Sequence, residues 1–318
     1  MLKVSVCMVT YNHEPFIAQA IESVLMQRTN FAYELVIGED CSTDGTRRVV
    51  ERYAERHPDV VRPLFREQNL GMHRNFVDTL SRCRGEYVAL LEGDDYWTDP
   101  YKLQKQAEFL DEHPEYMLVS GNAVTIREDE GYRVLRVAKE DQPVSFDFGA
   151  RELMLGNPCL TLTVMFRNGL VREFPDLYYR GSGGDRRFYL LLSEHGKCRY
   201  VNDLVGAYRV HSGSSVQRQL AAPHGRILCV QEQIRNAEAW NRYFGGRYAG
   251  EVEEVRLACS KHIVRFALEE ADIHTALSYA WWIDPTRLVR RRVRFAIGLM
   301  RYIARVLRVG PPSLHSAG

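Results

Sequence analysis

The first hundred residues alternate between short apolar runs and amphipathic segments, and this alternation constrains the fold more than any other feature of the chain. In the amphipathic segments apolar residues recur with helical spacing, as Phe16, Ala20 and Val24 do. Strands that alternate with helices form a parallel sheet with helices on its faces. We therefore expect an α/β fold that begins with strand 3–10, helix 15–28, strand 33–39, helix 43–56, strand 60–66, helix 74–83 and strand 86–91.

The remainder of the chain is less regular. A helix is expected from Pro100 to His113 and a strand over 117–126, whereas residues 128–150 are polar and are expected to be irregular. After them we expect a strand-rich stretch at 160–167, a Gly-rich loop at 181–185, a helix at 186–195, strands at 198–202 and 205–210, and helices from about residue 223 onward.

Three polar segments follow predicted strands at the point where each strand ends. They are residues 10–14, residues 39–45 and an acidic turn at residues 92–95. Because ligands gather at the carboxyl edge of parallel sheets, we expect the three segments to lie together there. This arrangement predicts a nucleotide site.

The acidic turn contains Glu92, Asp94 and Asp95 directly after an apolar strand. Carboxylates are hard oxygen ligands, and a site that supplies only one or two of them leaves room around Mg²⁺ or Mn²⁺ for water and diphosphate oxygens. The alternative is a solvated loop, which is the common state of an acidic turn. The metal interpretation predicts a nucleotide diphosphate as the ligand.

Composition excludes several classes of protein. The formal net charge is only +1, which gives no general argument for nucleic-acid binding. The seven cysteines are scattered and form no C-x-x-C pair, as is typical of a reduced cytosolic protein. Residues 3–9 have the pattern of a buried strand and lack the features of a signal peptide, and no apolar run is long enough to span a bilayer. We therefore expect a cytoplasmic protein.

Motifs spread over about residues 3–216 resemble, in their type and order, those of the family 2 glycosyltransferases with a GT-A fold. In chain order they are Val6 to Asn12, Glu39-Asp40 with Ser42 to Gly45, Asn69-x-Gly71 with Arg74-Asn75, Glu92-x-Asp94-Asp95, Gly184-Asp185 and Tyr208-Arg209-x-His211. Many members have Asp where this chain has Glu39 and Glu92. The resemblance implies a Rossmann-like, mostly parallel central sheet flanked by helices, with a C-terminal helical extension.

The resemblance also implies a domain organisation. Residues 1–216 would form the GT-A domain, with a nucleotide-sugar-binding half at about 1–115 and an acceptor-side half at about 116–216. Residues 217–318 would form a helical C-terminal region.

The implied reaction is an inverting transfer of a sugar from a nucleotide diphosphate donor to an acceptor hydroxyl. UDP is the expected nucleotide, because members of this family commonly use UDP-sugars. Direct displacement requires a base beside the acceptor, and the resemblance assigns that role to Asp185. The alternative for Asp185 is a helix N-cap, for which Asp is a preferred residue.

The resemblance further implies the residues that bind the donor and the metal, which would be Mn²⁺ or Mg²⁺. Nucleotide-sugar contacts are expected from Thr10, Tyr11, Asn12, Glu14, Asp40, Arg74 and Asp94. Metal ligands are expected to be Asp95 and Asp94, with a weaker claim for His211. Simpler roles remain open: a rim aromatic for Tyr11, a surface charge for Arg74, a local hydrogen bond for His211, and either a sugar platform or core packing for Tyr96 and Trp97.

A basic amphipathic helix is predicted at about residues 286–309. Seven of the arginines in this segment fall on one arc, namely Arg287, Arg290, Arg291, Arg294, Arg301, Arg305 and Arg308. Such a helix suits the surface of an anionic membrane, with a packed helix that has a solvated basic face as the alternative. The membrane interpretation favours a peripheral location at the inner face of the cytoplasmic membrane and a glycan or lipid-linked acceptor. No recognition module accompanies the arginines, so nucleic acid is not an expected partner.

These expectations favour an enzyme of bacterial cell-surface polysaccharide or glycolipid assembly. One alternative is a nucleotidyltransferase, but residues 9–15 contain neither the Gly nor the Lys that its phosphate loop needs. The other is a noncatalytic nucleotide-sugar-binding or membrane scaffold protein, which would not need a base at Asp185.

Overall fold

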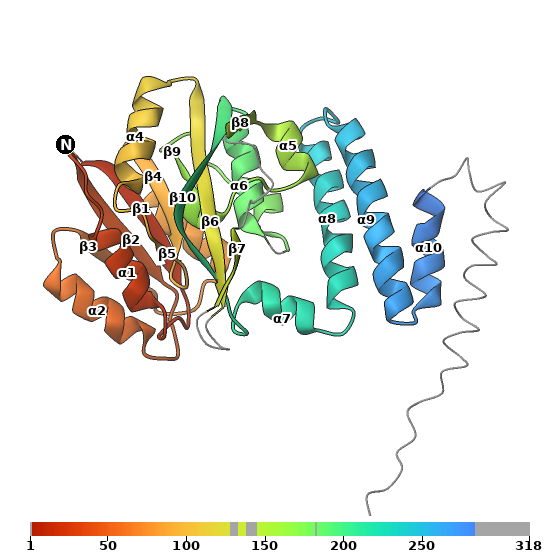
Figure 1. Cartoon of the computed structure of the whole chain (residues 1–318), viewed down its shortest axis with the longest axis horizontal. Coiled ribbons are helices and arrows are strands. Elements are labelled where there is room, and N and C mark those ends of the chain that lie inside the picture. Colours follow the sequence, from red (N-terminus) through yellow and green to blue (C-terminus); the bar gives the residue numbers. More distant parts are fainter. Residues whose placement is uncertain (1, 128–132, 138–144, 182, 284–318) are drawn as a thin grey trace, which may run out of the picture.

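The computed structural model describes residues 2–127, 133–137, 145–181 and 183–283. Within these ranges ten strands form one sheet, and helices pack on both of its faces (Figure 1). The strands are β1 Leu2–Thr10, β2 Ala32–Glu39, β3 Val61–Phe65, β4 Tyr87–Glu92, β5 Tyr96–Trp97, β6 Tyr116–Arg127, β7 Arg133–Val137, β8 Ser145–Phe148, β9 Met165–Arg167 and β10 Lys197–Val210. The α-helices are α1 Ile17–Leu25, α2 Thr46–Arg56, α3 Met72–Ser81, α4 Lys102–Glu112, α5 Ala150–Leu155, α6 Gly184–Ser193, α7 Ser215–Ala221, α8 Gly225–Tyr243, α9 Ala249–Glu269 and α10 Ile273–Ile283, and two short 3₁₀ helices are η1 Thr161–Thr163 and η2 Asp176–Tyr179.

The first strand, β1, lies in the interior of the sheet, and its side chains pack into apolar clusters on both faces. It pairs in parallel with β2 on one side and with β4 on the other. Val4, Val6 and Met8 are buried in the apolar cluster that contains α1 and α4, whereas Cys7 belongs to the cluster on the opposite face. A strand buried on both faces reads as a nearly continuous apolar run, as residues 4–9 do.

The strand order along the sheet is β3-β2-β1-β4-β9-β6-β10-β5. Along this order, neighbouring strands are parallel except where β9 runs antiparallel between β4 and β6 and where β5 runs antiparallel beside β10. Off this path, β7 runs antiparallel to β6 and β8 runs antiparallel to β10. The predicted mostly parallel α/β sheet flanked by helices is therefore confirmed. The parallel set β3-β2-β1-β4 brings the carboxyl ends of β1, β2 and β4 to one edge, where the polar segments were expected to meet.

The helices that follow β10 stand beside the α5 and α6 side of the sheet (Figure 1). Trp240 of α8 and Ile263 of α9 are buried in the same apolar cluster as Phe188 of α6, so this part of the core is continuous with the face of the sheet. The predicted boundary at residue 216 remains a prediction. The predicted basic helix at 286–309 lies outside the described residues.

Several local expectations differ from the structure. The stretch 128–150, expected to be irregular, contributes β7 and β8, which lengthen the sheet by pairing with β6 and β10. The predicted strand at 160–167 begins with η1 and only its end forms β9. The two strands predicted at 198–202 and 205–210 are one strand, β10, whose pairing with β6 shifts register between Tyr200 and Gly206. Across the described ranges, no helix has the length and apolarity that crossing a bilayer requires.

Candidate active site

The three polar segments predicted to share an edge are brought together by strand register. Thr10 at the end of β1 pairs with Glu39 at the end of β2, and Val9 pairs with Glu92 at the end of β4. The turn after Glu92 must pass close to the loop after β1. A Cβ added to Gly93 would lie 2.5 Å from Oγ1 of Thr10, so only glycine permits this approach.

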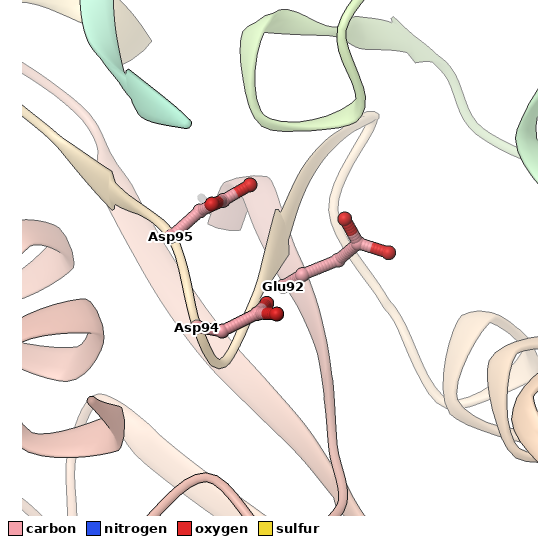
Figure 2. Close-up of side chains that lie close together, drawn as sticks. All are labelled: Glu92, Asp94 and Asp95. Carbon is pink, nitrogen blue, oxygen red and sulfur yellow. The ribbon is translucent and has the colours of Figure 1, made fainter. Parts of the chain in front are cut away.

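Glu92, Asp94 and Asp95 form a compact cluster at the turn between β4 and β5 (Figure 2). One carboxylate oxygen from each lies within 4.8 Å of the others. Burial raises the pKa of Glu92 to about 8, and the charges of Asp94 and Asp185 add to the shift. Burial, together with the charges of Asp94 and Glu92, also holds the pKa of Asp95 well above its usual value. Three carboxylates this close disfavour one another's charge unless a cation is shared among them.

The surroundings of Asp95 fit a bound cation. The residue is only 1 % exposed, and its Oδ1 accepts a hydrogen bond of 2.7 Å from the backbone N–H of Arg209. Its Oδ2 is buried and has no hydrogen-bond partner among the described residues. A buried oxygen without a partner is costly, and in a cluster of hard carboxylate ligands it suits a cation such as Mn²⁺ or Mg²⁺.

Asp94 lies beside two histidines that are far apart in the sequence. Its Oδ2 lies 3.1 Å from Nε2 of His211, just after β10, and 3.7 Å from Nε2 of His13, just after β1. Nδ1 of His13 lies 3.3 Å from the hydroxyl of Thr10. Burial works to raise the pKa of Asp94, but the hydrogen bond from His211 and the charges of both imidazoles outweigh it and the pKa is lowered. His211 was predicted at this site, whereas His13 was not.

Arg209 fixes the acidic turn, a role that sequence reasoning did not assign. The side chain is almost completely buried, between the rings of Phe16 at 4.6 Å and Tyr96 at 5.1 Å. Its guanidinium donates hydrogen bonds to the backbone carbonyl of Asp94 and, at 2.5 Å, to Oε1 of Gln19. The Tyr-Arg-x-His motif was the available signal, because its arginine lies two residues before His211.

The loops after β1 and β2 are tied to each other by predicted donor-binding residues. Oδ1 of Asn12 accepts a hydrogen bond of 2.8 Å from the backbone N–H of Thr43, and Oε2 of Glu14 accepts one of 2.8 Å from Gly45. Thr10 is buried, and its hydroxyl lies 3.3 Å from Nδ1 of His13. The structure thus places all three in the frame of the loops, and their contacts with a donor remain predictions.

The acidic pair Glu39-Asp40 organises two further loops. Glu39 is fully buried, where Oε1 accepts from the backbone N–H of Ser42 at 2.7 Å and Oε2 from Nε of Arg47 at 2.6 Å. Asp40 accepts backbone N–H groups with both oxygens, from Leu70 at 2.7 Å and from Gly71 at 3.0 Å. Glu39 therefore acts within its own loop, and Asp40 links the end of β2 to the start of α3.

Three aromatic or basic residues predicted near the donor differ in their exposure. Tyr11 is 38 % exposed at the rim of the loops, and Arg74 lies exposed in the first turn of α3. Trp97 is 1 % exposed, and its indole N–H donates to the backbone carbonyl of Leu162 at 2.7 Å. Of the two roles left open for Trp97, the structure therefore supports core packing.

Asp185 lies in the first turn of α6. The N-cap position belongs to Gly183, whose φ of 73° favours glycine, so Asp185 is not the N-cap. Oδ2 of Asp185 accepts hydrogen bonds from Nδ2 of Asn157 at 2.8 Å and from the hydroxyl of Thr161 at 3.5 Å. The negative charge of Asp185 contributes to the raised pKa of Glu92. The carboxylate predicted as a base therefore lies close enough to Glu92 for the two charges to interact.

Comparisons with known proteins agree with this fold. A family model described as "Glycosyl transferase family 2" matches residues 5–169. The uncharacterized protein Rv1520 of Mycobacterium tuberculosis is 42 % identical over 167 residues, which cover 51 % of this chain and 46 % of that protein. TuaG of Bacillus subtilis, whose name provisionally assigns it as a teichuronic acid biosynthesis glycosyltransferase, is 28 % identical over 212 residues, 66 % of this chain and 80 % of TuaG.

Among solved structures, residues 1–349 of TarS from Staphylococcus aureus in complex with UDP-GlcNAc superpose with a TM-score of 0.57 at 19 % identity, over 91 % of this chain and 92 % of that one. The chain belongs to glycosyl transferase family 2, and its fold is GT-A. The chain spans about half the length of the curated relatives that it matches first, 46 % in the case of Rv1520.

Proposed function

We propose that this protein is an inverting glycosyltransferase that moves a sugar from a UDP-sugar to an acceptor hydroxyl. The observation that carries the proposal is the pairing of two acidic groups at one edge of the sheet: the cluster of Glu92, Asp94 and Asp95, and the separate carboxylate of Asp185 whose charge acts on Glu92. Direct displacement needs these two functions, a site for the leaving diphosphate and a base for the acceptor.

Asp185 is the base in this proposal. As the acceptor oxygen forms its bond to the anomeric carbon, its proton passes to the carboxylate of Asp185, and the bond from that carbon to the diphosphate oxygen breaks. The electron pair of the broken bond leaves with the nucleoside diphosphate. Attack from the face opposite the leaving group inverts the configuration at the anomeric carbon.

Asp95 and Asp94 are the residues that would hold a divalent cation, with Oδ2 of Asp95 as the oxygen that lacks a partner. When bound, such a cation supplies positive charge that offsets the charge developing on the leaving diphosphate. His211 and His13 orient Asp94, and Arg209 fixes the backbone of the turn.

The nucleoside is proposed to lie on the loops that follow β1 and β2. Tyr11 is exposed there and offers an aromatic face, while Asn12 and Glu14 hold the loop against residues 43–45. Asp40 would act on the nucleotide from beneath, and the exposed Arg74 would meet its negative charge. UDP is proposed because the TarS structure holds UDP-GlcNAc and because family habit favours it.

We place the reaction in the assembly of a bacterial cell-surface polysaccharide or glycolipid. The name of TuaG supports this assignment, since it refers to teichuronic acid biosynthesis. A lipid-linked acceptor would also account for the basic segment at residues 286–309. By binding anionic lipid, this segment would bring the enzyme to the inner face of the cytoplasmic membrane.

The test is turnover with a panel of UDP- and GDP-sugars, with and without lipid-linked acceptors, in EDTA and in Mn²⁺ or Mg²⁺. We expect release of nucleoside diphosphate that depends on both cation and acceptor. NMR of the product should show that the anomeric configuration is inverted relative to the donor. A retained configuration would overturn the inverting mechanism. Tight donor binding without turnover on any acceptor would favour the noncatalytic nucleotide-sugar-binding alternative.

A further inference from the structure

Asn157 lies in the segment between α5 and η1, and the orientation of its amide is determined by its neighbours. Its Oδ1 accepts a hydrogen bond of 3.1 Å from the backbone N–H of Cys159. An amide oxygen accepts and an amide nitrogen donates, so this contact identifies the opposite end of the group as NH₂. That NH₂ lies 2.8 Å from Oδ2 of Asp185 and can only donate to it.

The hydrogen bonds to Asp185 fall on one of its two oxygens. Nδ2 of Asn157 and the hydroxyl of Thr161 both reach Oδ2, at 2.8 Å and 3.5 Å. Among the described residues no hydrogen bond reaches Oδ1. Donors on one oxygen fix the plane of the carboxylate and leave the other oxygen to take up a proton. A base that is held in this way does not have to reorganise when the acceptor arrives.

From this geometry we infer that Asn157 is the positioning residue for the base: it fixes the carboxylate of Asp185 through Oδ2 and directs Oδ1 toward the acceptor hydroxyl. The inference rests on the proposed function, because it requires Asp185 to be the base. It adds a residue from the α5–η1 segment, which contains none of the motifs by which the site was predicted. Thr161 supports the same oxygen over a longer distance and is expected to matter less.

Other charged and titratable groups also act on Asp185 and must be considered in any pH profile. They come from its own helix and from four other elements, and are Arg186, Arg187 and Tyr189 of α6, His73 of α3, Glu92 of β4, Tyr178 of η2 and Tyr208 of β10. A substitution at residue 157 leaves all of them in place. The difference between two variants at that position therefore reports on the amide group itself.

The experiment compares Asn157→Asp with Asn157→Leu. Asn157→Asp keeps an oxygen for the N–H of Cys159 but replaces the donor to Asp185 with a carboxylate oxygen, whereas Asn157→Leu removes both functions. Both should reduce kcat by about 10- to 100-fold, the usual cost of losing a hydrogen bond to a charged group. Because a donated hydrogen bond favours the ionised carboxylate, both should also move the acidic limb of the pH–rate profile upward.

Three controls separate the possible failures. Thr161→Val should give a smaller effect of the same kind, and Asn30→Asp, an exposed site far from the cluster, should leave kcat and the profile unchanged. Donor binding, measured by calorimetry, should be retained in every variant and shows that each is folded. If Asn157→Asp has the kcat and pH profile of the wild type while Asn157→Leu is impaired, Asn157 only holds its own loop and the inference is wrong. If Asp185→Asn retains turnover, the proposed function itself fails.

Discussion

His211 and Asp94 are joined across the end of the sheet, with Nε2 of His211 3.1 Å from Oδ2 of Asp94 although 117 residues separate them in the chain. This contact links the end of β10 to the acidic turn after β4. His13 approaches the same oxygen from the loop after β1, at 3.7 Å. The orientation of Asp94 therefore depends on three segments that are remote in sequence, and it is sensitive to changes in either histidine.

Replacing either histidine with alanine should weaken binding of Mn²⁺ in the presence of UDP by about tenfold, because groups that orient a metal ligand typically contribute that much. The measurement is a calorimetric titration, supported by the electron paramagnetic resonance of free Mn²⁺. His195→Ala, an exposed site elsewhere, is the control. Wild-type affinity in both His13→Ala and His211→Ala would contradict the role assigned to the pair.

Glu92→Gln should make the protein without divalent cation more stable at alkaline pH. The pKa of Glu92 is about 8 in the folded state, against 4.5 for an unperturbed Glu, so the folded state holds a proton that the unfolded state has lost. Wild-type stability therefore falls as pH rises from 4.5 to about 8. Near pH 8 the variant should exceed the wild type by about 1–2 kcal/mol in the free energy of unfolding, a difference that vanishes near pH 4. Urea denaturation in EDTA measures it, and equal stability near pH 8 would contradict the prediction.

Glu34→Gln should change the pH dependence of stability in the opposite direction. Burial works to raise the pKa of Glu34, but hydrogen bonds from Arg84, Ser5 and Arg62 outweigh it and lower the pKa to about 2. Because the folded-state pKa is depressed, the stabilisation is complete above pH 4.5 and is lost as pH falls toward 2. At neutral pH the variant should lose about 2 kcal/mol, after allowance for the solvent exposure of the two arginines. Urea midpoints that differ as much in acid as at neutral pH would count against this account.

Truncation after residue 284 should reduce binding to vesicles that contain anionic lipid, because the eight arginines between 287 and 308 are then lost. Co-sedimentation with vesicles of phosphatidylglycerol measures the effect, and vesicles of phosphatidylcholine are the control. Turnover on a soluble acceptor should survive the truncation. Unchanged binding to anionic vesicles would remove the proposed membrane role of this segment.

Sequence pattern was sufficient for the parallel part of the fold because its signals are local. Residues 4–8 are buried and read as a nearly continuous apolar run interrupted only by Ser5, and the neighbouring helices have apolar residues at helical spacing. β5 gave no such signal, and β9 forms only the end of the strand predicted at 160–167. They contain two and three residues, and their place in the sheet depends on pairing with β10, β4 and β6 rather than on their own composition.

The candidate site divides in the same way. Asp94, Asp95 and Asp185 stand in short motifs and were predicted from them, whereas His13, Arg209 and Asn157 acquire their roles only through folding. Each contacts an acidic residue far away in the sequence: 114 positions separate Arg209 from Asp95, and 28 separate Asn157 from Asp185. The Tyr-Arg-x-His motif pointed to Arg209 and His211 without giving their contacts, whereas no local pattern pointed to His13 or Asn157.

The most direct test of the central claim is the turnover of Asp185→Asn. The substitution preserves the shape of the side chain and removes its capacity to accept a proton as a carboxylate. We predict that release of nucleoside diphosphate with a competent acceptor falls by about 10²-fold or more, the lower range for general base catalysis, while binding of the UDP-sugar with Mn²⁺ is unchanged by calorimetry. Turnover close to that of the wild type, with equal donor binding, would contradict the assignment of Asp185 as the base and with it the proposed mechanism.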